Sequence, residues 1–206
     1  MECGEWNSIA EEPTLEEGTH VRPSFIEGAC PIPLTDAAGA IPDRLSTGDA
    51  ECYRVLGGGI VSGSLTLVGG DPGIGKSTLM LQVSKRIAGN AGKVLYVYGE
   101  ESFDQTRLRA RRLGALSGEV MLLTETSIDT IRKYIAGDDY ALVIIDSIQS
   151  VYSTQVPSAP GSAVQVRECA NEFLRIAKGC GVPVMLVGHV TKDGSIAGQK
   201  DRKSVV

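Results

Sequence analysis

Long apolar runs, paired cysteines and aromatic side chains are all scarce in this 206-residue sequence. No stretch approaches the ~18 consecutive apolar residues of a membrane span, and the start, MECGEWNSIAEE, lacks the basic-then-apolar pattern of an export signal. We therefore expect neither export nor membrane insertion. The five cysteines form no CxxC pair, which leaves no readable zinc site or disulfide framework. The net charge of -5 excludes a chain that is basic throughout, so any nucleic-acid contact must come from local basic clusters.

Residues 1–45 differ in composition from the rest of the chain. They contain five of its nine prolines, many acidic residues and no sustained apolar period, so we expect a largely extended arm or linker. From there to residue 198, apolar runs alternate with helical patterns, which predicts one folded core over 46–198. Residues 199–206 form a short tail of different composition.

Within the expected core, apolar runs of strand length alternate with segments of helical period. Strands are expected at 65–68, 94–98, 120–123, 141–145 and 183–187. Helices are expected at 76–88, 102–113, 127–136 and 164–180, and 147–162 has the Ser, Pro and Gly content of a loop. Strands that are apolar almost throughout and alternate with helices predict an α/β fold with a mostly parallel sheet and helices on both faces.

The segment GDPGIGKS matches the phosphate-binding pattern GxxxxGK[ST] and stands between an expected strand and an expected helix. Its glycines allow backbone N–H groups to converge on a phosphate, and the helix adds its positive end. Lys76 would reach the outer phosphates, and the Ser77 hydroxyl would bind Mg²⁺. A glycine-rich turn without a ligand is the alternative. The predicted nucleotide-binding residues are Gly70, Asp71, Pro72, Gly73, Ile74, Gly75, Lys76, Ser77 and Thr78.

Carboxylates follow two of the expected strands. Asp146 ends the run ALVIID, where the Mg²⁺-associated aspartate of such sites lies; a helix N-cap is the alternative. Glu100, after VLYVY and Gly99, is the preferred candidate for the base that activates the attacking water. The alternative is that Glu100 and Glu101 are solvated acids that precede a helix at Ser102.

His189 and Lys192 follow the last expected strand in VGHVTKDG. A polar side chain at this position could sense the terminal phosphate of a nucleotide and pass its state to the next loop. A histidine whose hydrogen bonds are simply satisfied is the alternative. The residues alone leave both interpretations open.

Six separated segments carry a more specific pattern than phosphate binding. They read RVLGGGIVSGSLTLVGGDPGIGKSTLMLQ, VLYVYGEES, RLRARRLG, IIDSIQSVYS, APGSAVQVRE and VGHVTKDGSIAG. Together they resemble the RadA family, also called Sms, of bacterial-type DNA repair ATPases in the RecA superfamily. The resemblance extends in order from about Pro31 to Gly198. It implies a RecA-like P-loop NTPase core that is incomplete at its C-terminal strands.

The resemblance also implies an ATP-driven motor that acts on single-stranded or branched DNA in recombinational repair and assembles as a homo-oligomeric ring. Its cofactors would be ATP and Mg²⁺, its catalytic residues Lys76 and Glu100, and its metal ligands Ser77 and Asp146. Residues 150–162, and the segment that begins at His189 and contains Lys192, would correspond to DNA-facing loops. The implied location is a bacterial-type cytoplasm, or a plastid or mitochondrion if the source is eukaryotic.

The expected helix over 102–113 is rich in arginine and forms a basic patch. Contact with nucleic-acid phosphates is one interpretation of this patch. A solvated helix face with ordinary ion pairs is the other, and the acidic net charge gives it at least equal weight. The arginines concerned are Arg107, Arg109, Arg111 and Arg112.

Both ends depart from the family pattern. Cys3, followed by Trp6 and Asn7, resembles only the end of the family's four-cysteine zinc finger, and a single thiolate forms no tetrahedral zinc site, so we expect no zinc. After Gly198, QKDRKSVV replaces the family's KNRFG-containing continuation, whose strands would pack beside the last one. We therefore expect a truncated chain that binds nucleotide and whose hydrolysis and ring formation are impaired. The competing functions are a catalytically silent nucleotide-binding subunit and another RecA-superfamily ATPase, such as a clock-type kinase or a helicase.

Overall fold

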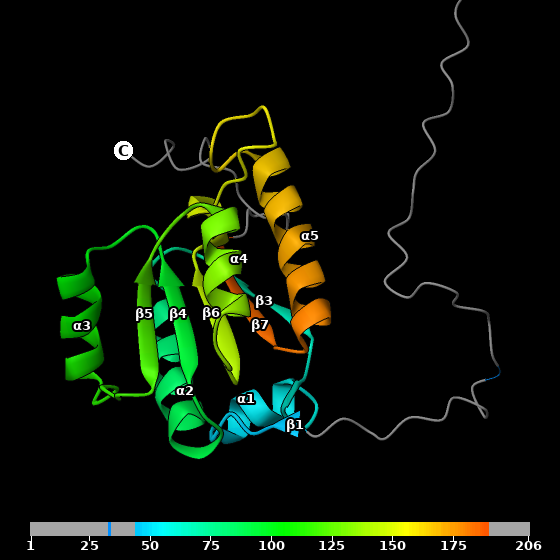
Figure 1. Ribbon diagram of the computed structural model, residues 1–206. Coiled ribbons are helices and arrows are strands. Elements are labelled where there is room, and N and C mark those ends of the chain that lie inside the picture. The colour runs from blue at the N-terminus through cyan, green and yellow to red at the C-terminus, as the bar shows by residue number, and fades with distance from the viewer. Residues whose placement is uncertain (1–32, 34–43, 190–206) are drawn as a thin grey trace, which may run out of the picture. The chain divides into compact units, whose positions relative to one another are not determined.

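The structure is a computed structural model that describes Pro33 and residues 44–189. The chain divides into two units, Met1–Ala37 and Ala38–Val206, and every element below belongs to the second. At its centre is a five-stranded parallel sheet (Figure 1). The strands, in the order in which they lie side by side, are β3 (Leu65–Gly70), β7 (Val184–His189), β6 (Leu142–Asp146), β4 (Val94–Tyr98) and β5 (Val120–Thr124).

Helices cover both faces of this sheet (Figure 1). α4 (Ile128–Ala136) and α5 (Ala163–Cys180) pack on one face, and α2 (Lys76–Asn90) packs on the other. α3 (Phe103–Arg112) lies beside β5 and adds Ala110 to the cluster on the α2 face. The predicted α/β architecture is therefore confirmed. No helix in the described part of the chain is both long and apolar enough to cross a membrane.

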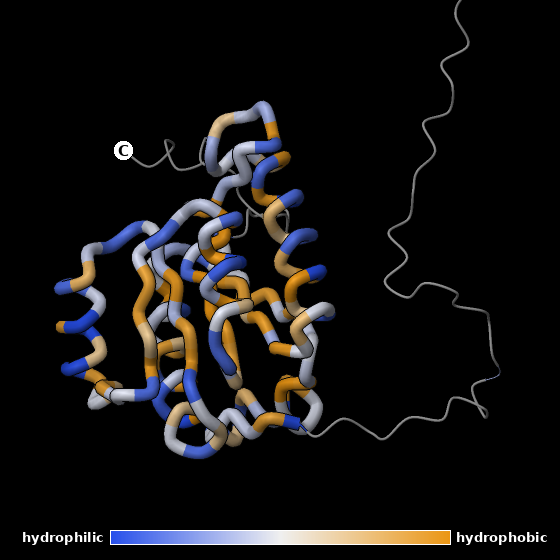
Figure 2. The backbone as a smooth tube through the Cα atoms, viewed as in Figure 1, coloured by the Kyte–Doolittle hydropathy of each residue, from blue (hydrophilic) through white to orange (hydrophobic). Residues whose placement is uncertain are grey.

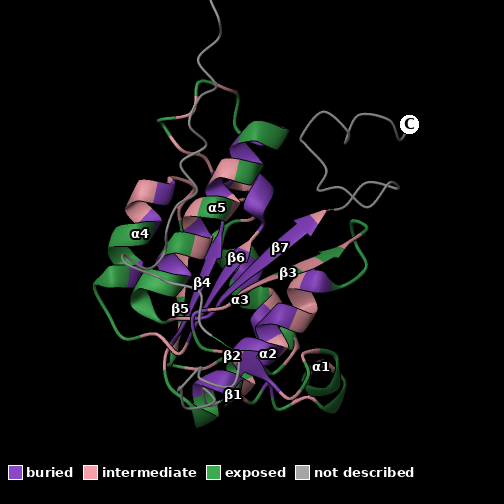
Figure 3. Cartoon of the chain, turned by 90° about the vertical axis from the view of Figure 1, so that its right-hand side faces the viewer, coloured by how far each residue is buried: buried purple, intermediate pink, exposed green. Residues whose placement is uncertain are grey.

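The side chains of the central strands alternate between two apolar clusters, as the pleat of a strand requires. In β4, Leu95 and Val97 pack with α4 and α5, whereas Tyr96 packs on the α2 face. All of β4 is buried, while the outer strands β3 and β5 are only partly covered (Figure 3). Figure 2 shows the same division as apolar strands between helices that carry polar residues on their outer sides. The central strands are thus fixed from both faces, and so are the residues at their ends.

A small two-stranded sheet and a short helix precede the central sheet, and the sequence patterns did not predict them. β1 (Arg44–Leu45) pairs antiparallel with β2 (Ile60–Val61), and α1 (Ala50–Val55) lies between them in the chain. Asp49 accepts a hydrogen bond from the N–H of Cys52, which caps α1, and forms an ion pair of 2.9 Å with Arg86 of α2. Elements this short give no usable periodicity.

Most of the sequence outside the core cannot be compared with the structure. β1 occupies the last two positions of the expected arm over 1–45, and the rest of that arm, apart from Pro33, lies outside the described residues. The zinc-finger remnant at Cys3 and the tail over 199–206 lie outside them as well.

The last strand in the sequence is an interior strand of the sheet. β7 pairs with β3 on one side and with β6 on the other, so the expectation that further strands would pack beside it is wrong. In the described sheet, the strands with one neighbour only are β3 and β5. The expectation failed because it took chain order for spatial order, whereas helical crossovers let a later strand enter between earlier ones.

Candidate nucleotide site

The carboxyl ends of β3, β7, β6 and β4 meet at one edge of the sheet. In the ladder Gly70 lies opposite His189, and Asp146 lies between Val187 and Tyr98. The phosphate loop after β3 and the acidic pair after β4 therefore start from the same edge. Ligands of open parallel sheets bind at this edge, outside the carboxyl ends of the strands.

The loop between β3 and α2 has the backbone that its glycines predict. Gly73 (φ +80°) and Gly75 (φ +104°) are left-handed, a conformation that a side chain at either position would strain. Gly75 is the N-cap of α2 and contributes no side-chain hydrogen bond, whereas Ser162 caps α5 through its hydroxyl. The first amides of α2 therefore meet no competing side chain from their cap, an arrangement that suits an anion.

Lys76 is buried and forms hydrogen bonds with its own loop. Its Nζ donates to the carbonyl oxygens of Gly70 and Asp71, both at 2.8 Å, and lies 3.3 Å from Nδ1 of His189. Because an ammonium group has only donors, Nδ1 is the acceptor in this contact. Burial lowers the pKa of Lys76, and nearby carboxylates, Asp146 first among them, partly offset this effect. The ammonium group thus donates to uncharged acceptors. A phosphate oxygen in their place would accept a stronger, charge-assisted hydrogen bond.

Two buried hydroxyl groups hold the two predicted carboxylates. The Tyr96 hydroxyl donates to Oδ2 of Asp146 at 2.6 Å, and the Ser147 hydroxyl donates to Oε1 of Glu100 at 2.6 Å. Tyr96 is 1% exposed and Ser147 3% exposed, so the surrounding core fixes both donors. Burial, together with the negative charge of Asp146, raises the pKa of Tyr96 well above its usual value, which keeps the hydroxyl protonated.

These strand ends and the start of α2 line one cavity of about 330 Å³. Lys76 and Ser77 reach it from α2, Asp146 from β6 and Glu100 from the segment after β4. Its volume lies at the lower end of the range for small-molecule sites. The other residues that line the cavity are Gly73, Gly75, Thr78, Glu101, Arg109, Ser147, Val187 and His189.

Four of the predicted loop residues do not line this cavity: Gly70, Asp71, Pro72 and Ile74. Gly70 and Asp71 take part indirectly, because their carbonyl oxygens accept the hydrogen bonds from Lys76. Ile74 is 70% exposed at the tip of the loop. Lys192, the second residue of the predicted sensor segment, lies outside the described residues.

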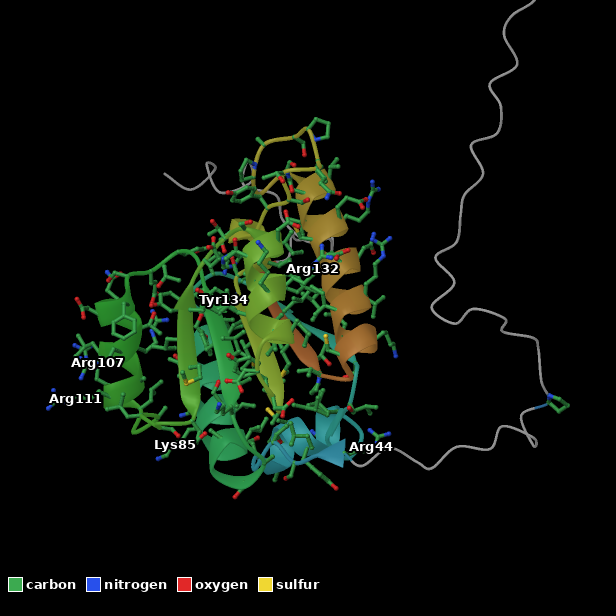
Figure 4. The ribbon with its side chains drawn as sticks, viewed as in Figure 1. Arg44, Lys85, Arg107, Arg111, Arg132 and Tyr134 are labelled. Carbon is green, nitrogen blue, oxygen red and sulfur yellow. The ribbon has the colours of Figure 1, made fainter. Side chains whose placement is uncertain are left out.

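The sequence patterns missed the place of Arg109 in the site. Arg109 forms an ion pair with Glu101, and both side chains line the cavity. Arg107 and Arg111 instead point away from the sheet on the outer side of α3 (Figure 4). The helical spacing could have separated them, because positions 107 and 111 share a face that position 109 does not. The predicted basic patch is therefore divided between the cavity and the outer surface.

One buried side chain organises the loop that was expected to face DNA. This loop runs from η2 (Ile148–Ser150) to α5, at the carboxyl end of the sheet (Figure 1). Gln165 of α5 is 1% exposed, and its Nε2, whose two N–H groups are donors, lies within 3.1 Å of three loop carbonyl oxygens, those of Ser153, Val156 and Ser158. Gln149 of η2 donates through Nε2 to the carbonyl of His189 at 3.1 Å. The loop and the end of β7 are thus physically linked beside the cavity.

The oxygen donors at this edge fit a magnesium ion that arrives with a nucleotide. Ser77 and Asp146 line the same cavity, and their hydroxyl and carboxylate oxygens are the hard ligands that Mg²⁺ prefers. Among residues 44–189, no group of three or more His, Cys, Asp or Glu side chains could hold a metal. The ion would therefore need further oxygens, and nucleotide phosphates supply them in sites of this kind.

Comparison with known sequences identifies close relatives. A model of the AAA domain family (AAA_25) matches residues 39–195. The DNA repair protein RadA of Halalkalibacterium halodurans is 52% identical over 201 residues, and the DNA repair protein RadA of Bacillus subtilis is 47% identical over 202 residues. Each alignment covers 96% of this chain and 44% of the relative. The chain therefore spans less than half the length of these curated relatives.

Solved structures show the same fold. The RadB recombinase superposes with a TM-score of 0.51 at 28% sequence identity, covering 72% of this chain and 71% of the recombinase. A DnaB-like replicative helicase, solved for its interactions with primase, gives a TM-score of 0.60 at 14% identity and covers 77% of this chain and 47% of the helicase. The helicase is too distant in sequence to indicate more than the fold. Both likenesses fit a RecA-like core.

Proposed function

Because this chain belongs to the AAA domain family and is a RadA-like member of the RecA superfamily, we propose that it binds ATP with Mg²⁺ and hydrolyses the nucleotide in DNA repair. One observation carries this proposal: Lys76, Ser77, Asp146 and Glu100, from three separate segments, line a single cavity. Phosphoryl transfer to water needs an anion cradle, metal ligands and a base in one place.

The phosphate loop would bind the triphosphate. Its left-handed glycines and the amides at the start of α2 would surround the phosphates, and the side chain of Lys76 would turn from its present carbonyl acceptors to the outer phosphates. This exchange replaces neutral acceptors by charged ones at the same ammonium group. Ser77 and Thr78, which follow Lys76 on α2, line the cavity beside it.

The metal site would consist of Ser77 and Asp146. An anionic triphosphate that enters this cavity meets the carboxylates of Asp146 and Glu100 as well as Lys76. A divalent cation held by Ser77 and Asp146 would offset this repulsion and would polarise the phosphoryl oxygens. The protein's part is to supply one hydroxyl and one carboxylate oxygen and to leave the remaining positions to phosphate and water.

Glu100 would act as the base for the attacking water. As the oxygen of the water bonds to the terminal phosphorus and the bond to the leaving diphosphate breaks, the carboxylate accepts the proton of the water. The hydrogen bond from Ser147 occupies Oε1 and fixes the orientation of the group. Glu101 is less suited to this role, because its carboxylate is engaged by Arg109.

The DNA-facing functions would lie beside the same cavity. Lys76 contacts His189, so a nucleotide that draws Lys76 away changes the surroundings of the imidazole. Gln149 then links His189 to the loop that begins after η2. We assign this loop and the segment from His189 to Lys192 to contact with single-stranded or branched DNA, within a homo-oligomeric ring. Support for this assignment comes from the RadA relatives and from the position of the loop at the carboxyl end of the sheet.

The test is phosphate release by the purified chain at fixed Mg²⁺, with and without single-stranded DNA, against a Lys76→Ala control. We expect turnover that rises with DNA and falls in Lys76→Ala. Binding of ATP without turnover would instead identify a nucleotide-binding subunit that is catalytically silent. Phosphate that appears on a Ser or Thr of the chain itself would indicate a kinase. Absence of nucleotide binding would overturn the proposal altogether.

A further inference from the structure

Two tyrosines of β4 offer an internal contrast at the metal site. Tyr96 and Tyr98 are two residues apart and both belong to the apolar cluster on the α2 face. In the ladder with β6, Tyr98 lies directly opposite Asp146, and Tyr96 lies opposite Ile144, two residues earlier. The more distant tyrosine is nevertheless the one that reaches the aspartate: its hydroxyl lies 2.6 Å from Oδ2. Register alone therefore does not account for the bond.

We propose that Tyr96 is a positioning residue for the metal site: its hydroxyl bond to Oδ2 fixes the Asp146 carboxylate so that Oδ1 serves the nucleotide-bound Mg²⁺. This inference rests on the proposed function, since it deepens the role of Asp146 in the same site. Outer partners that bind metal ligands orient them and strengthen metal binding by about 10- to 100-fold.

The position of the hydroxyl indicates a polar role beyond packing. A phenylalanine would fill the same core volume, so packing alone does not call for the oxygen at Tyr96, which is 1% exposed. Burying a hydroxyl costs free energy unless it forms a hydrogen bond, and here the acceptor is an ionisable carboxylate at the cavity wall. The terminal torsion of an aspartate has a broad, roughly two-fold profile, and one fixed oxygen is enough to restrict it.

Tyr98 supplies the matched control. It is 3% exposed, shares the strand and the face of Tyr96, and its hydroxyl has no hydrogen-bond partner within the part of the chain that the structure describes. Changing either tyrosine to phenylalanine removes the same atom from the same cluster. Only Tyr96→Phe removes a hydrogen bond to Asp146, so the pair separates that bond from any general effect of losing a buried phenol oxygen.

The experiment measures binding of a fluorescent ATP analogue to the full chain, first in EDTA and then across a Mg²⁺ series, for wild type, Tyr96→Phe and Tyr98→Phe. We expect all three to bind with similar affinity in EDTA. Mg²⁺ should increase the affinity for the analogue, and the Mg²⁺ concentration that gives half of this increase is the quantity compared. It should rise about 10-fold in Tyr96→Phe and change less than about 2-fold in Tyr98→Phe. Circular dichroism of each variant establishes that the fold is retained.

A double-mutant cycle with Asp146→Asn tests whether Tyr96 acts through Asp146. If Tyr96 acts through Asp146, adding Tyr96→Phe to Asp146→Asn should not shift the Mg²⁺ dependence further. Equal Mg²⁺ curves for Tyr96→Phe and Tyr98→Phe, or a further shift in the Asp146→Asn background, would overturn the inference while the proposed function stands. A wild-type chain that binds no nucleotide, or whose binding ignores Mg²⁺, overturns the proposed function itself.

Discussion

The phosphate loop and the carboxylate pair lie on the same cavity but are constructed in opposite ways. The loop residues before α2 are exposed, and their geometry comes from the backbone, through left-handed glycines and the end of a helix. The carboxylates of Asp146 and Glu100 take their positions from side chains, because each accepts a hydrogen bond from a hydroxyl group fixed in the core. One region is set by local chain conformation and the other by packing between distant segments.

Because the two regions are built differently, substitutions in them should have different effects on nucleotide binding and on turnover. A backbone cradle binds any phosphate of the right size, so the loop should govern whether nucleotide binds at all. Carboxylates oriented by hydroxyl groups of the core would act at defined points, on the metal and on the attacking water, so they should govern what happens to the bound nucleotide. Variants of the two regions should therefore separate binding from turnover.

The largest effect is expected at Glu100. Glu100→Gln keeps the size of the side chain and its acceptor oxygen for Ser147 but removes the base. We expect turnover to fall by about 10²- to 10⁴-fold, the usual contribution of a general base, with nucleotide affinity nearly unchanged. Phosphate release under saturating ATP and a separate binding titration measure the two quantities.

Glu101→Gln is the control for this prediction, since it removes a neighbouring carboxylate that is paired with Arg109. Its turnover should stay well above that of Glu100→Gln. The reverse order of the two variants would move the base to position 101. Loss of nucleotide binding in Glu100→Gln would instead contradict the assignment of binding to the loop and of turnover to the carboxylates.

The next largest effect is expected at Lys76, on the loop side of the comparison. Lys76→Ala should weaken nucleotide binding by about 10- to 100-fold, the worth of a hydrogen bond to a charged group, because the ammonium can no longer reach the phosphates. Lys85→Ala is the matched control, because Lys85 lies on the same helix (Figure 4), is exposed and does not line the cavity. Calorimetric titration compares the two. Equal affinities would show that the backbone binds phosphate without the lysine.

The loop could be predicted from the sequence because its signal is local. Eight consecutive residues specify the turn, the start of the helix and Lys76, and the structure has the left-handed glycines that the pattern requires. The sequence also predicts that Asp146 and Glu100 lie near this loop, because parallel strands end at a common edge, and both side chains line the cavity. Their hydroxyl partners could not be found in this way, since Tyr96 reads as an ordinary apolar strand residue until the strand order β6–β4 places it beside Asp146.

Two other features could not be predicted because the sequence does not show which segments lie side by side in the fold. Arg109 was grouped with its neighbours on a basic helix, but only the folded chain shows that it pairs with Glu101 and lines the cavity. The last strand was expected at an edge, but crossovers place it between β3 and β6. In each case the helix or strand was predicted correctly from the local pattern, but its neighbours in the fold were not.

The smallest effect tests the backbone side of the comparison by itself. Gly75 has φ +104° and Gly89 lies in α2, and a Cβ added at either meets no atom within 4 Å. Packing is thus equal, and only backbone conformation differs. Gly75→Ala should lower the free energy of unfolding by about 1–2 kcal/mol, whereas Gly89→Ala should raise it by about 0.5–1 kcal/mol. Urea unfolding of the nucleotide-free chain measures both. If Gly75→Ala were as stable as wild type, residue 75 would not be left-handed in the nucleotide-free chain. The loop would then adopt its phosphate-binding conformation only when the ligand binds.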